Sequence, residues 1–416
     1  MHEHQLRILQ PRVLGLSLLA SVGACSQRNI SGQLAATHFG DLSNPSAERQ
    51  DGRLALRAAC GEPPARDATS PGLRAPFLQQ VTDGSATLVW VAADPHPSVV
   101  LSTSEGSDLG TVAAALDSTA QVPAGEVQWT EPLGALAPDT TYCYSVDAAH
   151  AGRVGFRTAP APGRGTPVRF IAFGDSGYGG SDQLALRDQM GTVPFDFMIH
   201  TGDIAYDTGT RDELQKYFFD VYADFLGQFP VFPASGNHEY GTEDAAPFRE
   251  AFVLPENGGE EGKERWYSFN WGDVHFVALD TERTGQAQAD WLDADLSANS
   301  LPWTIVYGHK PPFSSGERGG DSDFRTTFTP VLEKHHVPLV LNGHEHDYER
   351  TTPQNGVTYV VTGGGGVGVR SVGSSPFTAV SDAVIHFVYV TVSGDQLALH
   401  AIDGLGHEFD SLVLHR

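Results

Sequence analysis

Five apolar runs of this chain end in the same way, with a small residue followed by a side chain that can bind a metal. The runs are VRFIAFGD, DFMIHTGD, FPVFPASGNH, LPWTIVYGH and VPLVLNGH, and they end at Asp175, Asp203, His238, His309 and His344. In a parallel α/β sheet, ligands bind beyond the carboxyl ends of the strands. The pattern therefore predicts an α/β domain whose strand ends gather carboxylates and imidazoles around one site.

The last run continues as GHEH, so that His344 and His346 share one face of an extended segment. Each short motif by itself is most often a turn or a helix cap. Independent turns do not explain two carboxylates, an amide and three imidazoles at successive strand ends, and these are ligand chemistries that bind metals. We therefore expect a metal site.

The overall charge limits the choice of partner. The chain has 26 Lys and Arg against 51 Asp and Glu, which gives a formal net charge of −25. A nucleic-acid partner is not expected, because phosphate backbones need basic patches. A small phosphate ester remains possible, since a local site sets its binding.

Taken together, five motifs resemble those of the calcineurin-like metallophosphoesterases, and more narrowly those of the purple acid phosphatases. They are GDSG (174–177), GDIAY (202–206), GNHE (236–239), VYGH (306–309) and GHEH (343–346). The resemblance covers about residues 167–416. It implies a four-layer α/β/β/α sandwich as the catalytic domain.

The resemblance also implies two metal ions, with Asp203 as the ligand that bridges them. The first ion, expected to be Fe(III), is held by Asp175, Tyr206 and His346, and the second, a divalent Zn, Fe or Mn, by Asn237, His309 and His344. Most metallophosphoesterases have a histidine two residues after the first aspartate, whereas this chain has Gly177. A phenolate from Tyr206 would replace it, and such a hard anion favours Fe(III).

Catalysis is expected to follow the same resemblance. A metal-bound hydroxide would attack phosphate monoesters, with an acid pH optimum, and His238 would protonate the leaving alcohol while Glu239 orients it. A phosphodiesterase or nucleotide hydrolase on the same metals is one alternative, decided by pocket loops such as residues 310–324. A degenerate surface-binding protein is another. The glycine run at 361–368 could lie near the metals, but alone it is weak evidence for phosphate binding.

The chain in front of this domain divides by composition. Residues 26–70 are expected to be a flexible linker, and residues 159–166 a second one. Between them, residues 71–158 have short alternating strands typical of a β-sandwich. The stretch LAPDTTYCYSV resembles part of a fibronectin type III domain, with Tyr142 as its corner tyrosine. No prediction of oligomeric state follows.

Residues 1–25 have the pattern of an export signal, and VGAC resembles a bacterial lipobox in which Cys25 is lipidated. Ordinary signal cleavage is the alternative. A lipid on Cys25 would be the sole expected membrane contact, in a bacterial envelope; otherwise the protein would be periplasmic or extracellular. The other two cysteines, Cys60 and Cys143, are candidates for one disulfide in an exported chain.

Overall fold

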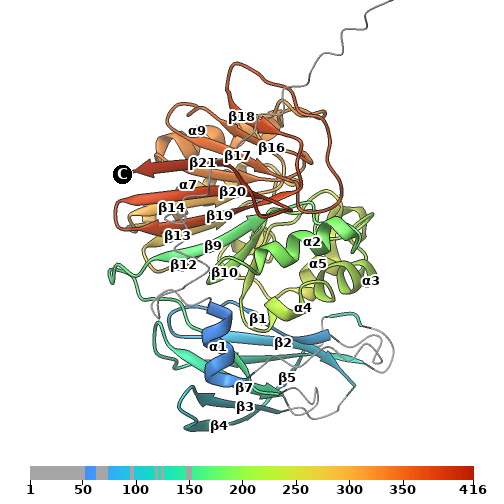
Figure 1. The fold of residues 1–416 in the computed structure, drawn as a ribbon, viewed down its shortest axis with the longest axis vertical. Coiled ribbons are helices and arrows are strands. Elements are labelled where there is room, and N and C mark those ends of the chain that lie inside the picture. The colour runs from blue at the N-terminus through green and yellow to red at the C-terminus, as the bar shows by residue number, and fades with distance from the viewer. Residues whose placement is uncertain (1–51, 62–73, 94–97, 118–119, 123–125, 147–151) are drawn as a thin grey trace, which may run out of the picture.

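The computed structural model describes residues 52–61, 74–93, 98–117, 120–122, 126–146 and 152–416, which form two bodies (Figure 1). A small β-sandwich precedes a larger α/β domain. The predicted signal segment, with Cys25, and residues 26–51 and 62–70 of the predicted linker lie outside the described residues. No helix in the described part is long and apolar enough to cross a membrane.

Two four-stranded antiparallel sheets form the N-terminal body, as the alternating apolar pattern predicted. One sheet has the order β1 (Arg74–Gln79), β2 (Ala86–Ala92), β6 (Val127–Leu133), β5 (Ala115–Asp117). The other has the order β4 (Asp108–Ala113), β3 (Ser98–Thr103), β7 (Thr141–Val146), β8 (Val154–Arg157). The Tyr142 hydroxyl accepts the backbone N–H of Ala137 at 2.8 Å, the bond of a tyrosine corner.

The predicted linker at 26–70 is wrong for part of its length, because helix α1 spans Gly52–Cys60. Leu56 and Cys60, four residues apart, share the buried face of this helix, which packs on β7 and β8. Cys60 forms a disulfide with Cys143 on β7. A single pair of apolar residues at helical spacing does not predict a helix, so the sequence did not distinguish this segment from the polar linker around it.

Replacing both Cys60 and Cys143 by serine is expected to lower the melting temperature and to release α1. The bond closes a chain segment of 83 residues, and such a cross-link is worth roughly 3–5 kcal/mol through the unfolded state. Calorimetry and limited proteolysis at residues 52–61 would measure both effects. Reductant should reproduce them in the wild type and change nothing in the double variant. A wild type that is insensitive to reductant would contradict the prediction.

The α/β domain has two mixed sheets. The six-stranded sheet has the order β11 (Val231–Pro233), β10 (Phe197–His200), β9 (Val168–Phe173), β19 (His386–Ser393), β20 (Gln396–Asp403), β21 (Glu408–His415). The seven-stranded sheet has the order β12 (Tyr267–Trp271), β13 (Val274–Ala278), β14 (Trp303–Tyr307), β15 (Leu339–Asn342), β17 (Thr358–Thr362), β16 (Tyr348–Thr351), β18 (Thr378–Asp382).

Aromatic side chains hold the two sheets together. Phe232 stacks on Phe269 with ring centroids 3.7 Å apart, and Phe170 meets Phe276 edge-on at 5.3 Å. Helix α2 (Ser181–Met190) packs on the six-stranded sheet, whereas α7 (Gln286–Ala298) and α9 (Thr329–Lys334) join the apolar cluster of the other sheet. The predicted four-layer fold class is confirmed. The remaining α-helices described in this domain are α3 (Arg211–Glu213), α4 (Ala223–Leu226), α5 (Ala246–Ala251), α6 (Gly259–Gly262) and α8 (Ser322–Thr327).

The sandwich packs directly on the α/β domain. Phe77 of β1 lies 5.0 Å from the ring of Phe219, and the buried guanidinium of Arg74 covers that ring at 3.8 Å. The hydroxyl of Tyr144 donates to the carbonyl of Gly227 at 2.8 Å. The two bodies therefore share one apolar core, which extends from the sandwich into the α/β sheets.

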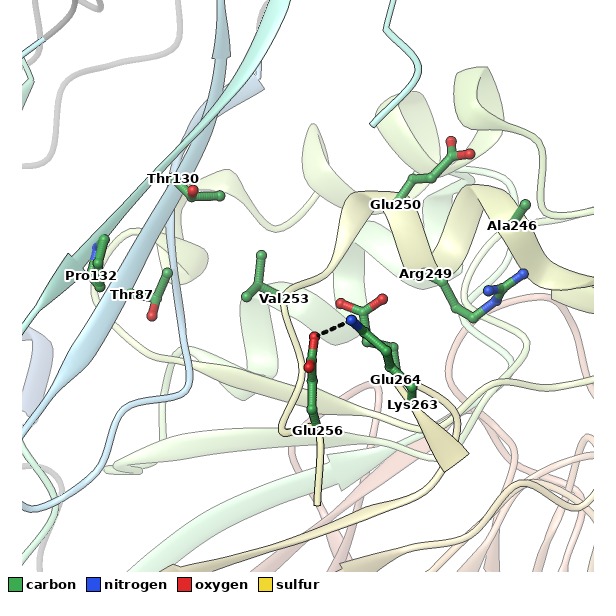
Figure 2. Close-up of a pocket in the computed structure, with 10 residues that line it drawn as sticks. All are labelled: Thr87, Thr130, Pro132, Ala246, Arg249, Glu250, Val253, Glu256, Lys263 and Glu264. Carbon is green, nitrogen blue, oxygen red and sulfur yellow. Dashed lines mark ion pairs between the residues drawn. The ribbon is translucent and has the colours of Figure 1, made fainter. Parts of the chain in front are cut away.

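A groove of about 630 Å³ also lies between the bodies. Figure 2 shows Thr87, Thr130 and Pro132 of the sandwich across the groove from residues of α5 and of the segment after it, with an ion pair of 2.9 Å between Lys263 and Glu256. None of the predicted metal ligands lines this groove.

Candidate metal centre

The seven predicted metal ligands come from loops that follow strands of both sheets. Strands β9, β10 and β11 are parallel neighbours, and the loops after them carry Asp175, Asp203 with Tyr206, and Asn237. Strands β14 and β15 are parallel neighbours in the other sheet, and His309 and the His344–His346 pair follow them. The site therefore lies where the carboxyl ends of the two sheets meet.

The turns that carry the ligands are unusually tight. Asp175, Asp203 and His344 have positive φ angles of 57°, 52° and 73°, a conformation that costs energy and gathers at functional sites. The glycines that precede Asn237 and His344 let the donor loops lie close together. A Cβ atom on Gly236 would lie 2.3 Å from Asp203 Oδ1, and one on Gly343 would lie 2.5 Å from Asp175 Oδ2.

Tyr206 lies at the centre of the first group of donors. Its buried hydroxyl is 3.0 Å from Asp175 Oδ1, 3.3 Å from Asp203 Oδ2 and 3.4 Å from His346 Nε2. His346 Nε2 is also 3.4 Å from Asp175 Oδ1. Four side chains from three loops thus direct their donor atoms at one point.

Asp203 also belongs to the second group. Its Oδ2 lies 3.1 Å from His309 Nε2, which is 3.2 Å from Asn237 Oδ1 and 3.1 Å from His344 Nδ1. The donor atoms of Asp203, His309 and His344 all lie within 4.8 Å of one another. The carboxylate of Asp203 is thus common to both groups.

These separations fit bound cations. Two donors held at about 2.1 Å from one ion, at roughly 90–110° to each other, lie about 3.0–3.4 Å apart. The donors are two carboxylates, a phenol, an amide and three imidazoles, a mixture suited to Fe(III) and to divalent ions such as Zn. The residues present therefore fit a two-metal centre.

The pKa values of Tyr206 and His309 show that buried negative charge dominates the site. Burial, followed by the charges of Asp175 and Asp203, raises the pKa of Tyr206 well above its ordinary value. Burial would lower the pKa of His309, but the charge and hydrogen bond of Asp203, together with the charge of Asp175, outweigh it and raise that pKa to about 10. Without a cation, His309 is therefore positively charged beside the buried carboxylates, and Tyr206 remains a neutral phenol. A bound metal would displace the protons that these two groups hold.

Backbone groups set the orientation of the ligands. His309 Nδ1 donates to the carbonyl of Thr201 at 3.0 Å, which leaves Nε2 directed at the other donors. The backbone N–H of His238 donates to Asp203 Oδ1 at 2.8 Å, and that of His344 donates to Asp175 Oδ2 at 2.8 Å. The two carboxylates are therefore fixed before any metal binds.

Comparison with known proteins shows which family the segment that carries these donors resembles. Residues 168–348 match the family model of the calcineurin-like phosphoesterases. The chain carries a calcineurin-like phosphoesterase domain. The match begins at β9 and ends just beyond the GHEH motif, so it contains all seven donor residues of the candidate centre.

Individual relatives are similar at a lower level. An uncharacterized protein of Mycobacterium tuberculosis is 29% identical over 268 residues, which cover 53% of this chain and 50% of that protein. A probable inactive purple acid phosphatase of Arabidopsis thaliana is 25% identical over 334 residues, which cover 63% of this chain and 54% of that protein. The chain thus spans about half the length of these curated relatives.

A solved structure extends the likeness of fold to the sandwich. The purple acid phosphatase of yellow lupin seeds superposes with a TM-score of 0.70 at 22% identity, and the match covers 84% of this chain and 75% of that one. Such coverage extends beyond the phosphoesterase domain. The comparison supports the architecture of a β-sandwich joined to a phosphoesterase body.

Glu239 has a different position from the predicted one. Its fully buried carboxylate accepts the backbone N–H groups of Asp203, Ile204 and Gly236, at 2.8–3.0 Å. It makes no hydrogen bond to the ring of His238, and its bonds reach the backbone of two loops that carry predicted metal ligands. Glu239 is therefore a positioning residue that joins two ligand-bearing loops.

His238 lies on the solvent side of the same domain, with 19% of its side chain exposed. Its Nδ1 bonds to the carbonyl of Asp207, and its Nε2 lies 3.6 Å from Asp203 Oδ2. The ring packs on Tyr206 at a centroid distance of 4.1 Å. The imidazole therefore borders both groups of donors without being enclosed by them.

The glycine run explains the missing histidine at position 177. A Cβ atom on Gly177 would lie 3.0 Å from the backbone of Val367, and its φ angle of +106° disfavours any side chain. Nearby, a Cβ on Gly365 would lie 2.1 Å from the carbonyl of Gly174. The glycine run in this phosphoesterase domain thus packs against the loop that carries Asp175, in the space that a side chain at 177 would need.

Proposed function

We propose that this protein is a metal-dependent phosphatase that hydrolyses phosphate monoesters. The observation that carries the proposal is the convergence of seven donor side chains, with Asp203 common to two groups. The family match supports phosphoester hydrolysis, and the relatives that bear the name purple acid phosphatase support the monoester class.

Each residue then has a defined task. Asp175, Tyr206 and His346 would hold the first cation, proposed to be Fe(III), and Asn237, His309 and His344 the second, a divalent Zn, Fe or Mn ion. When bound, two such cations supply Lewis-acid activation of water and of the phosphoryl group. Asp203 would hold both, because one anion between two cations reduces their repulsion.

His238 is the candidate general acid. With Nδ1 donating to the Asp207 carbonyl, its second nitrogen, Nε2, faces the donor groups and can carry the proton that the departing alcohol needs. Its partly exposed position, on the solvent side of the donors, leaves room for the alcohol.

His238→Ala should keep both metals but slow esters with poor leaving groups by about 10²–10⁴-fold. Hydrolysis of p-nitrophenyl phosphate should fall much less, because its leaving group needs no proton. The measurement compares kcat for an alkyl phosphate and for p-nitrophenyl phosphate. His335→Ala is the control, since that ring pairs with Asp293 at 2.7 Å, away from the donors. Equal losses on both esters would argue against the acid role.

The function itself is tested by metal loading. Purified protein reconstituted with iron and zinc should bind two ions per chain by elemental analysis and hydrolyse p-nitrophenyl phosphate. A protein that holds two ions but hydrolyses no monoester would refute the proposal and support the degenerate binding protein. The complete donor set is the reason that we prefer an active enzyme, although the Arabidopsis relative is named probable inactive.

We further propose that the protein is exported. The N-terminal segment pattern and the disulfide between Cys60 and Cys143 support this, because disulfides persist in oxidising compartments. The lipidated form predicts that Cys25→Ser releases the protein from the membrane fraction. Mass spectrometry of the mature N-terminus decides the matter, since an unmodified Cys25 or cleavage elsewhere would contradict the lipid anchor.

A further inference from the structure

Residues 310–321 belong to the loop between β14 and α8, and this loop is bonded to the segment that carries His344 and His346. The backbone N–H of Ser315 donates to Glu349 Oε2, and that of Arg318 to Glu345 Oε1, both at 2.6 Å. Both carboxylates belong to fully buried residues. These two bonds fix the backbone at Arg318 relative to the GHEH motif.

Gly316 tightens the same connection. A Cβ atom there would lie 2.7 Å from Asp347 Oδ2 and 2.8 Å from Glu345 Oε2, so that only glycine allows the loop to lie this close. The backbone of Arg318 is therefore placed before any substrate arrives, which lowers the entropy cost of using its side chain.

The side chain of Arg318 extends to the edge of the metal centre. Its Nη1 atom lies 3.3 Å from His344 Nδ1 and 3.4 Å from His344 Nε2. His344 Nδ1 is itself 3.1 Å from His309 Nε2. The guanidinium thus lies against a ligand of the proposed second cation, and Arg318 is exposed to solvent on its other side.

This guanidinium has no carboxylate partner within the described ranges. Other arginines of this acidic chain are paired, as in Arg350 with Asp410 at 2.6 Å and Arg169 with Asp196 at 2.9 Å. An arginine whose guanidinium contacts only the His344 ring among side chains, and has no carboxylate to pair with in the described ranges, is suited to binding phosphate oxygens.

We propose that Arg318 binds a terminal phosphoryl oxygen of the substrate and thereby makes this site select phosphate monoesters over diesters. The inference rests on the proposed phosphatase function and adds its substrate preference. A monoester has three terminal oxygens and is a dianion above its second ionisation, near pH 6. In a diester a second substituent replaces one of those oxygens and one charge is lost, so Arg318 has less to bind.

The competing role for Arg318 is structural. Its contact with His344 could serve only to hold that imidazole in place. In that case the removal of the guanidinium would weaken the second metal, and hydrolysis of every substrate would fall by the same factor. The two roles therefore predict different results for metal content and for the ratio of two substrates.

The experiment compares Arg318→Gln and Arg318→Lys with wild type at pH 7, on p-nitrophenyl phosphate and bis(p-nitrophenyl) phosphate. Both substrates release the same alcohol, so differences report on the phosphoryl group. For Arg318→Gln we expect kcat/KM to fall about 10–100-fold on the monoester, the range for a lost charge-assisted hydrogen bond, and less than about threefold on the diester. Arg318→Lys, which keeps the charge but not the fork, should lie between.

Two further readouts complete the test. The inhibition constant of inorganic phosphate should rise in Arg318→Gln by a factor similar to the loss on the monoester, while elemental analysis still finds two metals per chain. The control is Arg157→Gln, which removes the same charge from an exposed ion pair with Asp139 on the sandwich and should change neither substrate.

An equal fall on both esters, or a loss of metal in Arg318→Gln, would overturn the inference in favour of the structural role. An unchanged monoester rate would overturn it as well. Failure of the proposed function is distinguishable, because a wild type with two metals and no activity on either ester would refute the phosphatase itself. In that case, calorimetry of the metal-loaded proteins still tests Arg318, because weaker binding of inorganic phosphate by Arg318→Gln than by wild type would support a contact between Arg318 and phosphate.

Discussion

Asp203→Asn is expected to abolish hydrolysis and to release both metals. The amide keeps the shape of the side chain and can still accept the backbone N–H of His238, which now bonds to Oδ1 at 2.8 Å. It loses the negative charge that both groups of donors share. We expect kcat to fall by more than about 10³-fold, since even one electrostatic group at an active site contributes about 10²–10³-fold.

The measurement is metal stoichiometry together with kcat in the same preparation. Asp182→Asn, an exposed position in the first turn of α2, is the matched control and should leave both unchanged. The surroundings of Asp203 also favour its ionised form, which is the form that binds cations. Burial alone would raise the pKa of Asp203, but the positive charges of His309 and His238 hold that pKa below its ordinary value. An Asp203→Asn protein that retained two tightly bound metals would show that Asp203 is not the bridge.

Tyr206→Phe should remove the visible colour of the iron-loaded protein. A phenolate bound to Fe(III) absorbs visible light by charge transfer, and the substitution removes the single oxygen responsible. The ring itself is 2% exposed and packs on His238 and Tyr178, so the fold should survive. The affinity of the first metal should fall by at least about 10–100-fold, the cost of losing even an outer-shell partner.

Tyr178→Phe provides the control for that experiment. Its ring lies 5.4 Å from that of Tyr206, and its hydroxyl bonds to Asp207 rather than to a donor. The visible band should therefore persist in this variant. A Tyr206→Phe protein that kept its band, or an iron-loaded wild type without one, would exclude Tyr206 as a ligand.

The parts of this protein that sequence predicts best are those in which a local pattern determines a position in space. A strand followed by glycine and a ligand fixes both the element and the edge of the sheet to which it delivers a side chain. The donor atoms of Asp175, Asp203, His309 and His344 therefore lie where strand order and parallel pairing require. The β-sandwich is predictable for the same reason, since strand alternation specifies which face is buried.

Other features depend on contacts between segments that are distant in sequence. The carboxylate of Glu239 could not be placed among the backbone groups of the Asp203 loop, because its own motif suggests only proximity to His238. Gly177 looked like a lost ligand, and the reason for it is the backbone of Val367, 190 positions further along the chain. Arg318 lies in a loop without periodicity, so no pattern pointed to His344.

The donors of the candidate metal centre are divided between two sheets. Asp175, Asp203 and Asn237 follow strands of one sheet, and His309, His344 and His346 follow strands of the other. A bound metal pair would therefore connect the two sheets, which pack through the aromatic layer in which Phe232 stacks on Phe269. A substitution in that layer that shifts one sheet against the other would therefore change the distances between the donors and lower the affinity for metal.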